Sequence, residues 1–182
     1  MVAVPAAPLP TTHRHQPAAP IHLQVVVHRA VRRVAQIQVA QLQVEQLQVA
    51  VVAQVNAYRA SARVCGTVAF GAAGALSWNG ALASAAEVHS NDMAVNNYFA
   101  HPDANGVRIG GRASAAGYSY GSVGENIAAG QTSASQVVAD WMASASHCEN
   151  IMKASFYDIG VSCKYNPSAM YQYYWTLTMG NH

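Results

Sequence analysis

The sequence predicts an α+β domain preceded by an N-terminal segment of unlike composition. Segments with helical patterning come first along the domain and two strand-like segments come last, an order typical of an α+β fold. The composition changes near residue 50, from Pro-rich and Gln-rich sequence to the mixture of a globular protein. A chain of 182 residues can form one domain with a proper core and an additional segment. We therefore expect one domain over residues 51–182.

Residues 1–50 have the composition of a low-complexity arm or linker. Five of the seven prolines fall within the first 23 residues, at Pro5, Pro8, Pro10, Pro17 and Pro20. Such a segment is typical of extended or disordered chain. The repeat "VAQIQ", "VAQLQ", "VEQLQ" follows over Val34–Gln48, and its apolar residues step alternately by three and two. The mean step of about 2.5 residues fits neither a helix nor a strand, so we expect a poorly ordered Gln-rich linker there.

Three segments of the domain have the patterning of helices. "VVAQVNAYRASAR" begins at Val51 and ends before the glycines of "GAAGA". In "NGALASAAEVHSNDMAVNNYF" one face holds Leu82, Ala86, His89 and Met93. Because His89 lies on this apolar face, we expect it to be structural. In "TSASQVVADWMAS" the spacing of Ser133 and Gln136 predicts a capping box.

The C-terminal part of the domain has the patterning of strands. "DIGVSCKY" and "MYQYYWTLTMG" are rich in β-branched and aromatic residues, and the turn-like "NPSA" separates them. We expect their aromatic side chains, and Trp141, to lie in the core. "DANG", earlier in the chain, is expected to be a plain turn.

The stretch "SASHCENIM" predicts the start of a helix. Ser146 and Glu149 have capping-box spacing, which would make His147 the first helical residue. The positive end of the helix dipole disfavours imidazolium, and the neutral ring is the form that binds metal or accepts a proton. Neighbouring residues on a helix point about 100° apart, so His147 is badly placed to act as a base for Cys148.

Four motifs in order resemble one known family: "AEVHSNDMAVNNYFAHPD", "GENIAAG", "VVADWMASASHCENIM" and "YYWTLTMG". They are similar to the bacterial branch of the CAP superfamily, which comprises cysteine-rich secretory proteins, antigen 5 and pathogenesis-related proteins and whose module is also called the SCP domain. The resemblance covers roughly residues 51–180. It implies a three-layer α-β-α sandwich with an open cleft lined by two histidines and two acidic residues.

Carried over by motif, the cleft residues are His101, Glu125, Asn126, Ser144 and His147. Ser144 stands where many relatives have the second acid, which implies a smaller and less anionic cleft. Two imidazoles and a carboxylate can hold zinc with one position open, so His101 and His147 are candidate ligands for a divalent metal. Alternatively the carboxylate orients one ring, or the three residues form only a buried polar network.

Three cysteines, Cys65, Cys148 and Cys163, allow three single pairings and leave one thiol over. The resemblance favours a bridge at Cys148, with Cys65 as the first choice of partner and Cys163 as the alternative. A bridge implies an oxidising compartment. We recognise no signal peptide in this chain, and expect an extracellular or cell-envelope location from the resemblance and the cysteines.

The resemblance implies a secreted or envelope-associated binding module for a divalent metal such as zinc, or for a small apolar, lipid-like or sterol-like ligand. The alternative is a structural or protein-interaction domain with a vestigial cleft. A metal-dependent hydrolase ranks third, because Ser144 is the sole nucleophile candidate and nothing obvious activates it; we lean against an enzyme. With a net charge of +2 and no long basic run, we expect no nucleic-acid partner. We also expect no transmembrane segment, and a monomer whose partner is a small ligand or a protein.

Overall fold

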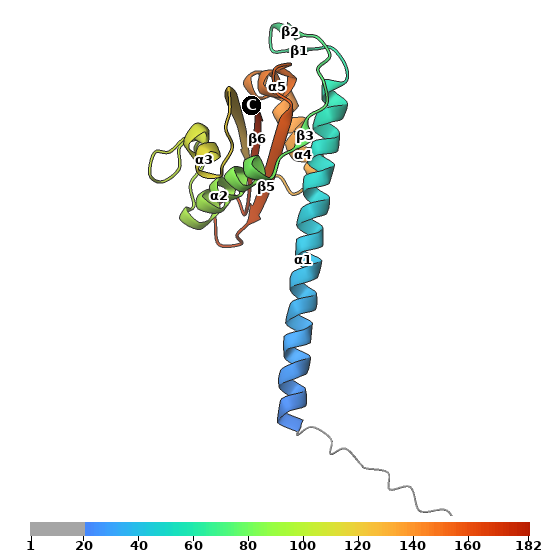
Figure 1. Ribbon diagram of the computed structural model, residues 1–182, viewed down its shortest axis with the longest axis vertical. Helices are drawn as coiled ribbons and strands as arrows, with labels where there is room; N and C mark the ends of the chain where they lie inside the picture. The colour runs from blue at the N-terminus through green and yellow to red at the C-terminus, as the bar shows by residue number, and fades with distance from the viewer. Residues whose placement is uncertain (1–20) are drawn as a thin grey trace, which may run out of the picture. The chain divides into compact units, whose positions relative to one another are not determined.

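A computed structural model of the chain describes residues 21–182 (Figure 1). Most of the Pro-rich segment expected to be extended, residues 1–20, lies outside the described residues. The chain divides into two units, residues 1–40 and 41–182, and the second unit contains the folded domain. Its elements, with the helix that enters it, are α1 Ile21–Arg59, β1 Arg63–Cys65, β2 Val68–Phe70, β3 Ser77–Trp78, α2 Gly80–Asn96, α3 Ile109–Ala115, β4 Ser122–Ala129, α4 Ala134–Ala143, α5 Ala145–Met152, β5 Asp158–Tyr165 and β6 Tyr173–Asn181.

The Gln-rich repeat is helical, so the expectation that Val34–Gln48 is poorly ordered is wrong. Helix α1 runs without a break from Ile21 to Arg59 and crosses residue 50. No Gly or Pro interrupts it, and its many Ala, Gln and Leu residues have high helix propensity. A repeat of five residues turns by about 140° around a helix, so its apolar residues do not share one face. The five-residue repeat therefore gives no amphipathic signal for this helix, although the residue composition favours helix formation.

The central sheet has four strands in the order β3-β5-β6-β4. β5 and β6 are antiparallel over their whole length, from Asp158 opposite Gly180 to Tyr165 opposite Tyr173. These are the two predicted strands. β4 pairs antiparallel with β6 and forms one edge, while the short β3 pairs parallel with β5 and forms the other. β4 contains the "GENIA" motif and is the edge at which the candidate site lies.

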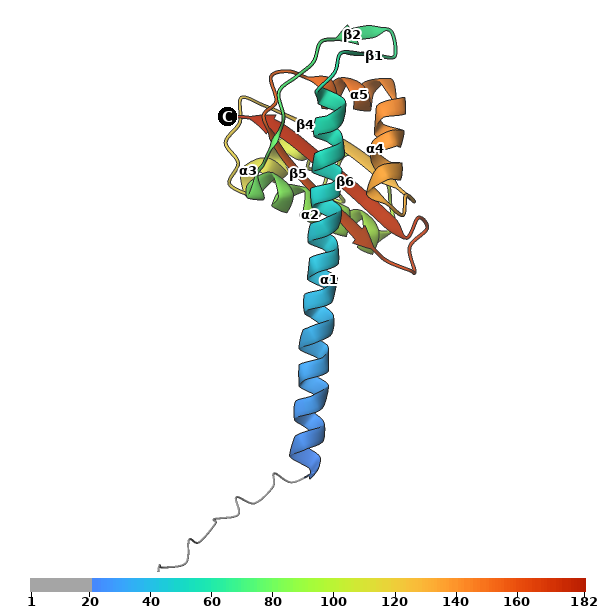
Figure 2. The same ribbon diagram turned by 90° about the vertical axis from the view of Figure 1, so that its right-hand side faces the viewer.

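Helices cover both faces of the sheet, which confirms the α+β sandwich (Figures 1 and 2). Helices α2 and α3 lie on one face. Helix α2 approaches β5 closely because Gly160 has no side chain: a Cβ there would lie 2.1 Å from the Ala83 nitrogen. The other face is covered by α4, α5 and the part of α1 from Gln41 onward. The main core lies on this side and includes Val55, Trp141 and Leu177.

Two long-range connections hold α5 against the end of α1. The buried Arg59 guanidinium donates to the carbonyl oxygens of Gly74, Ile151, Lys153 and Phe156 at 2.5–3.0 Å. Burial lowers the Arg59 pKa. A disulfide joins Cys65, in the β1–β2 hairpin, to Cys148 in α5. This pairing is the first of the two that the resemblance favoured, and Cys163 on β5 is a free thiol.

Candidate functional site

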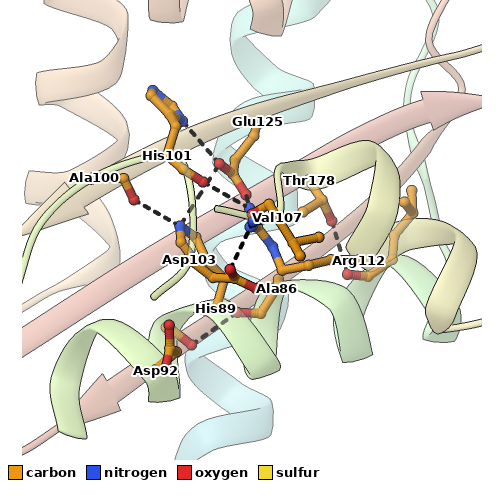
Figure 3. A network of polar contacts seen from close by, with 12 residues as sticks. Ala86, His89, Asp92, Ala100, His101, Asp103, Val107, Arg112, Glu125 and Thr178 are labelled. Carbon is orange, nitrogen blue, oxygen red and sulfur yellow. Dashed lines mark hydrogen bonds and ion pairs between the residues drawn. The ribbon is translucent and has the colours of Figure 1, made fainter. Parts of the chain in front are cut away.

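The Glu125 carboxylate is the centre of a buried polar network (Figure 3). It lies on the edge strand β4 and its side chain is 2% exposed. The His101 Nδ1 is 2.9 Å from Oε1, and the Arg112 Nη2 is 2.5 Å from Oε2. The His89 Nε2 lies 3.9 Å from Oε1. Both carboxylate oxygens are therefore engaged by side chains of the network.

Arg112, on helix α3, fixes the loop that presents His101. Besides its ion pair with Glu125, it donates to the carbonyl oxygen of Val107 at 2.5 Å and to that of His101 at 3.2 Å. Its side chain is buried. The sequence analysis missed this residue. The only available signal is an arginine among small residues, in "IGGRASA".

His89 is structural in its contacts and also belongs to the network. The ring is completely buried, as its position on the apolar face of α2 predicts. Its Nε2 lies 3.0 Å from the Ala100 carbonyl oxygen, so this nitrogen carries the proton of the neutral ring. Nδ1 is buried without a partner. Burial lowers the pKa of His89, and the Glu125 charge opposes that shift.

Glu125 orients the His101 ring. A carboxylate can only accept, so Nδ1 of His101 donates to it and the Nε2 of the neutral ring has a free lone pair. The His101 side chain is 45% exposed. This is the arrangement in which a carboxylate orients a histidine, one of those expected from the sequence. Within residues 21–182, no group of three or more His, Cys, Asp or Glu residues is placed to hold a metal ion.

His147 lies at the third position of α5, and the predicted cap at Ser146 is wrong. Helix α4 ends at Ala143, and Ser144 is the extended residue from which α5 begins at Ala145. The Ser144 side chain makes no capping hydrogen bond. Burial lowers the pKa of His147, and the charge of nearby His101 lowers it further. The neutral ring is favoured as expected, but by burial and a neighbouring imidazole.

Asn126 is a buried residue that supports the candidate site and does not line it. Its side chain is completely buried. Nδ2 donates to the His147 carbonyl oxygen at 3.0 Å, and Oδ1 accepts from Asn150 at 3.0 Å. Neighbouring residues of a strand point to opposite faces, so Asn126 cannot share the environment of Glu125. It positions the backbone of His147.

An open pocket of about 290 Å³ lies beside His147. It is lined by Phe99, Ile127, Ala128, Ala129, Gln131, Asp140, Trp141, Ser144, His147 and Tyr171. The Trp141 Nε1 donates to the Ile127 carbonyl oxygen at 3.1 Å, which ties α4 to the edge of β4. The predicted cleft residues therefore separate into two groups. Ser144 and His147 line the pocket, whereas His101 and Glu125 belong to the neighbouring network.

Most of the lining residues were not predicted as site residues, and three of them, Phe99, Asp140 and Tyr171, give the pocket its exposed aromatic rings and its carboxylate. Phe99 and Tyr171 are exposed aromatic residues from distant loops, with ring centroids 6.0 Å apart. Tyr171 was expected in the core. Asp140 lies four residues before Ser144, one helical turn away, so the pocket keeps a carboxylate although Ser144 is not an acid. That spacing of four was the available signal.

A larger apolar hollow, of about 650 Å³, lies elsewhere on the domain. It is lined by α1 residues Glu45, Gln48, Val49, Val52 and Ala53 together with Trp78. It contains none of the candidate site residues. Among the described residues, no helix is long and apolar enough to cross a membrane.

Comparison with known proteins agrees with this fold. The profile of the cysteine-rich secretory protein family, CAP, matches residues 52–179. Protein YkwD of Bacillus subtilis is 39% identical over 80 residues, which is 44% of this chain and 31% of that protein. The solved structure of an extracellular protein with an SCP domain from Bacillus anthracis is 27% identical, with a TM-score of 0.53 over 60% of this chain and 35% of that one.

A more distant structure shows the fold alone. An outer surface protein of Borrelia burgdorferi is 20% identical, with a TM-score of 0.54 over 59% of this chain and 77% of that one. The chain spans about a third of the length of the two Bacillus proteins it matches. Because the family profile matches residues 52–179, which is most of the chain, the chain belongs to the cysteine-rich secretory protein (CAP) family.

Proposed function

We propose that the chain is a secreted or envelope-associated module that binds a small, largely apolar molecule in the pocket beside His147. The observation that carries the proposal is the pocket itself, about 290 Å³ with mostly apolar walls at the sheet edge where the family motifs meet. Small-molecule sites are typically concave, mostly apolar, and provided with a few polar groups. The pocket volume is near the lower end of the range of small-molecule sites, which favours a small ligand or a single hydrocarbon chain.

The pocket offers one surface for the apolar part of such a ligand and another for its polar group. Phe99 and Tyr171 are 44% and 43% exposed, so contact with an apolar group would remove aromatic surface from water. His147 and Ser144 supply hydrogen-bonding groups on the same lining. A neutral imidazole can accept from or donate to a ligand without the cost of burying a charge.

The disulfide and the relatives support the proposed location. Cys65 and Cys148 are bridged, and such bridges persist in oxidising compartments. One similar structure is described as extracellular and another as an outer surface protein.

Titration calorimetry of the full chain with 1-octanol tests this proposal. Binding should weaken several-fold in Tyr171→Ala, because an exposed aromatic wall is lost. Trp78→Ala is the matched control, since Trp78 is similarly exposed but lines the other hollow. Equal affinity of the Tyr171 variant and the parent, or loss only in the Trp78 variant, would place the ligand elsewhere and refute the proposal.

A divalent metal at His101 and His147 is the second candidate. It is supported by the free Nε2 of His101, whose ring Glu125 orients, and by the proximity through which His101 lowers the pKa of His147. Two imidazoles without a protein carboxylate would make an open, weak site. Calorimetry with zinc should show binding to the full chain and none to the His101→Ala/His147→Ala variant; equal binding to both would refute it.

A further inference from the structure

We propose that the pocket beside His147 selects ligands that carry a protonated amine on an apolar body, with Asp140 as the counter-ion. This inference rests on the proposed function and specifies its ligand class. It is drawn from the charges, acceptors and walls of the pocket.

Asp140 is a carboxylate without a cationic partner. Its Oδ2 accepts one hydrogen bond, from Gln131 Nε2 at 2.8 Å. No Lys, Arg or His in the described part of the chain lies within ion-pair distance of it. Among the lining residues Asp140 is the only Asp or Glu, and none is Lys or Arg. The lining therefore has one carboxylate and no Lys or Arg to neutralise it.

Gln131 holds that carboxylate in position. Its Nε2 donates to Asp140, and a flipped amide would set one oxygen against another, so the orientation is fixed by chemistry. The remaining atom, Oε1, is buried without a hydrogen-bond partner. The Gln131 carbonyl oxygen accepts from Trp175 Nε1 at 2.8 Å, which holds the residue in place.

The apolar walls favour the same charge. The rings of Phe99 and Tyr171 line the pocket, and the face of an aromatic ring attracts a cation. A carboxylate ligand would instead face Asp140 as a like charge without any compensating cation. A neutral alcohol would satisfy one acceptor and gain nothing from the charge.

Asp140 and Gln131 also stand at a boundary between apolar and polar surroundings. Both residues line a second hollow, of about 320 Å³, together with Gly130, Thr132 and Gln136. The Asp140 carboxylate thus lies between the apolar pocket and a more polar hollow. This is the placement that suits an amphiphilic amine, whose tail is buried and whose ammonium group stays partly hydrated.

The test compares three probes with the same tail: octylamine, 1-octanol and sodium octanoate, titrated into the full chain at pH 7 and low salt. Octylamine should bind about fivefold tighter than 1-octanol, the scale of a partly exposed charge pair with a cation–π contribution. Octanoate should bind more weakly than 1-octanol. The preference for the amine should shrink as salt rises.

Asp140→Asn should abolish the preference for octylamine over 1-octanol, because the variant pocket has no carboxylate to pair with the ammonium group. Glu149→Gln, which removes a negative charge from the neighbouring helix α5 without altering the pocket lining, should keep it. Equal binding of the amine and the alcohol, or a preference that survives Asp140→Asn, would overturn the inference while the proposed function stands. Binding of none of the three probes would overturn both.

Discussion

Arg112 offers the sharpest test of the network around Glu125. Replacing it by methionine keeps an unbranched side chain of similar length but removes the guanidinium that lies 2.5 Å from the Glu125 Oε2. The Glu125 side chain is 2% exposed and the Arg112 side chain 3% exposed, so water cannot replace the lost partner. The variant therefore has a buried carboxylate with His101 as its one close polar side-chain partner.

The expected loss follows from what the guanidinium contacts. Removal of one member of a buried ion pair costs about 3–5 kcal/mol of unfolding free energy, because the other charge stays buried. The carbonyl oxygens of His101 and Val107 lose their donor as well. We expect a loss near the upper end of that range. A second change, Glu125→Leu, removes the stranded charge and should restore most of the stability.

Urea unfolding of the parent, Arg112→Met and the double variant measures these differences. Arg108→Met is the matched control, because Arg108 is an exposed arginine at the start of the same helix. The Arg108→Met change should lower the free energy of unfolding by less than about 0.5 kcal/mol. A loss below about 1 kcal/mol for Arg112→Met, or a double variant no more stable than the single one, would refute the account of the network.

Three further predictions concern stability. Replacing Cys65 and Cys148 together by alanine should cost about 4 kcal/mol in urea unfolding, since the bridge closes a loop with a sequence separation of 83; a loss below about 1 kcal/mol would contradict this. Arg59→Met should cost at least about 3 kcal/mol, because four carbonyl oxygens lose a charged donor and two of these hydrogen bonds, to Ile151 and Phe156, are buried, whereas the partly exposed Arg63 should tolerate the same change. The pKa of His89 in the folded protein is lowered from 6.5. The contribution of the neutral ring to the free energy of unfolding is therefore complete above pH 6.5 and is lost as the pH falls, at up to about 1.4 kcal/mol per pH unit. His89→Gln should therefore flatten the fall in stability between pH 6.5 and 5, and an unchanged slope would contradict this.

The elements that the sequence predicted are those with local signals. Helix α4 has its cap at Ser133, whose oxygen accepts from the Gln136 amide, and an apolar stripe. Strands β5 and β6 have runs of β-branched and aromatic residues. The two-residue β3 and the seven-residue α3 could not be predicted in this way, because pairing with β5 and the Arg112 contacts define them. These contacts join residues far apart in sequence.

The residues of the candidate site also divide into those with a local sequence signal and those that only folding brings together. The positions of His101, Glu125 and His147 came from short motifs that resemble those of the family. Phe99 and Tyr171 lie in loops 72 positions apart, and only the folded chain brings their rings to 6.0 Å. Their exposure also hides them from an analysis based on apolar burial, since exposed aromatic residues look like core residues in the sequence.

The most direct test of the central claim is to locate a bound probe on the full chain. In a titration of the 15N-labelled protein with 1-octanol, the account predicts shifts in the amide signals of Phe99, Ile127–Ala129 and Tyr171, which surround the pocket beside His147. The signals around Val49 and Trp78, at the other hollow, should stay in place. Shifts confined to Val49 and Trp78, or no shifts at all, would contradict the assignment of the pocket as the binding site.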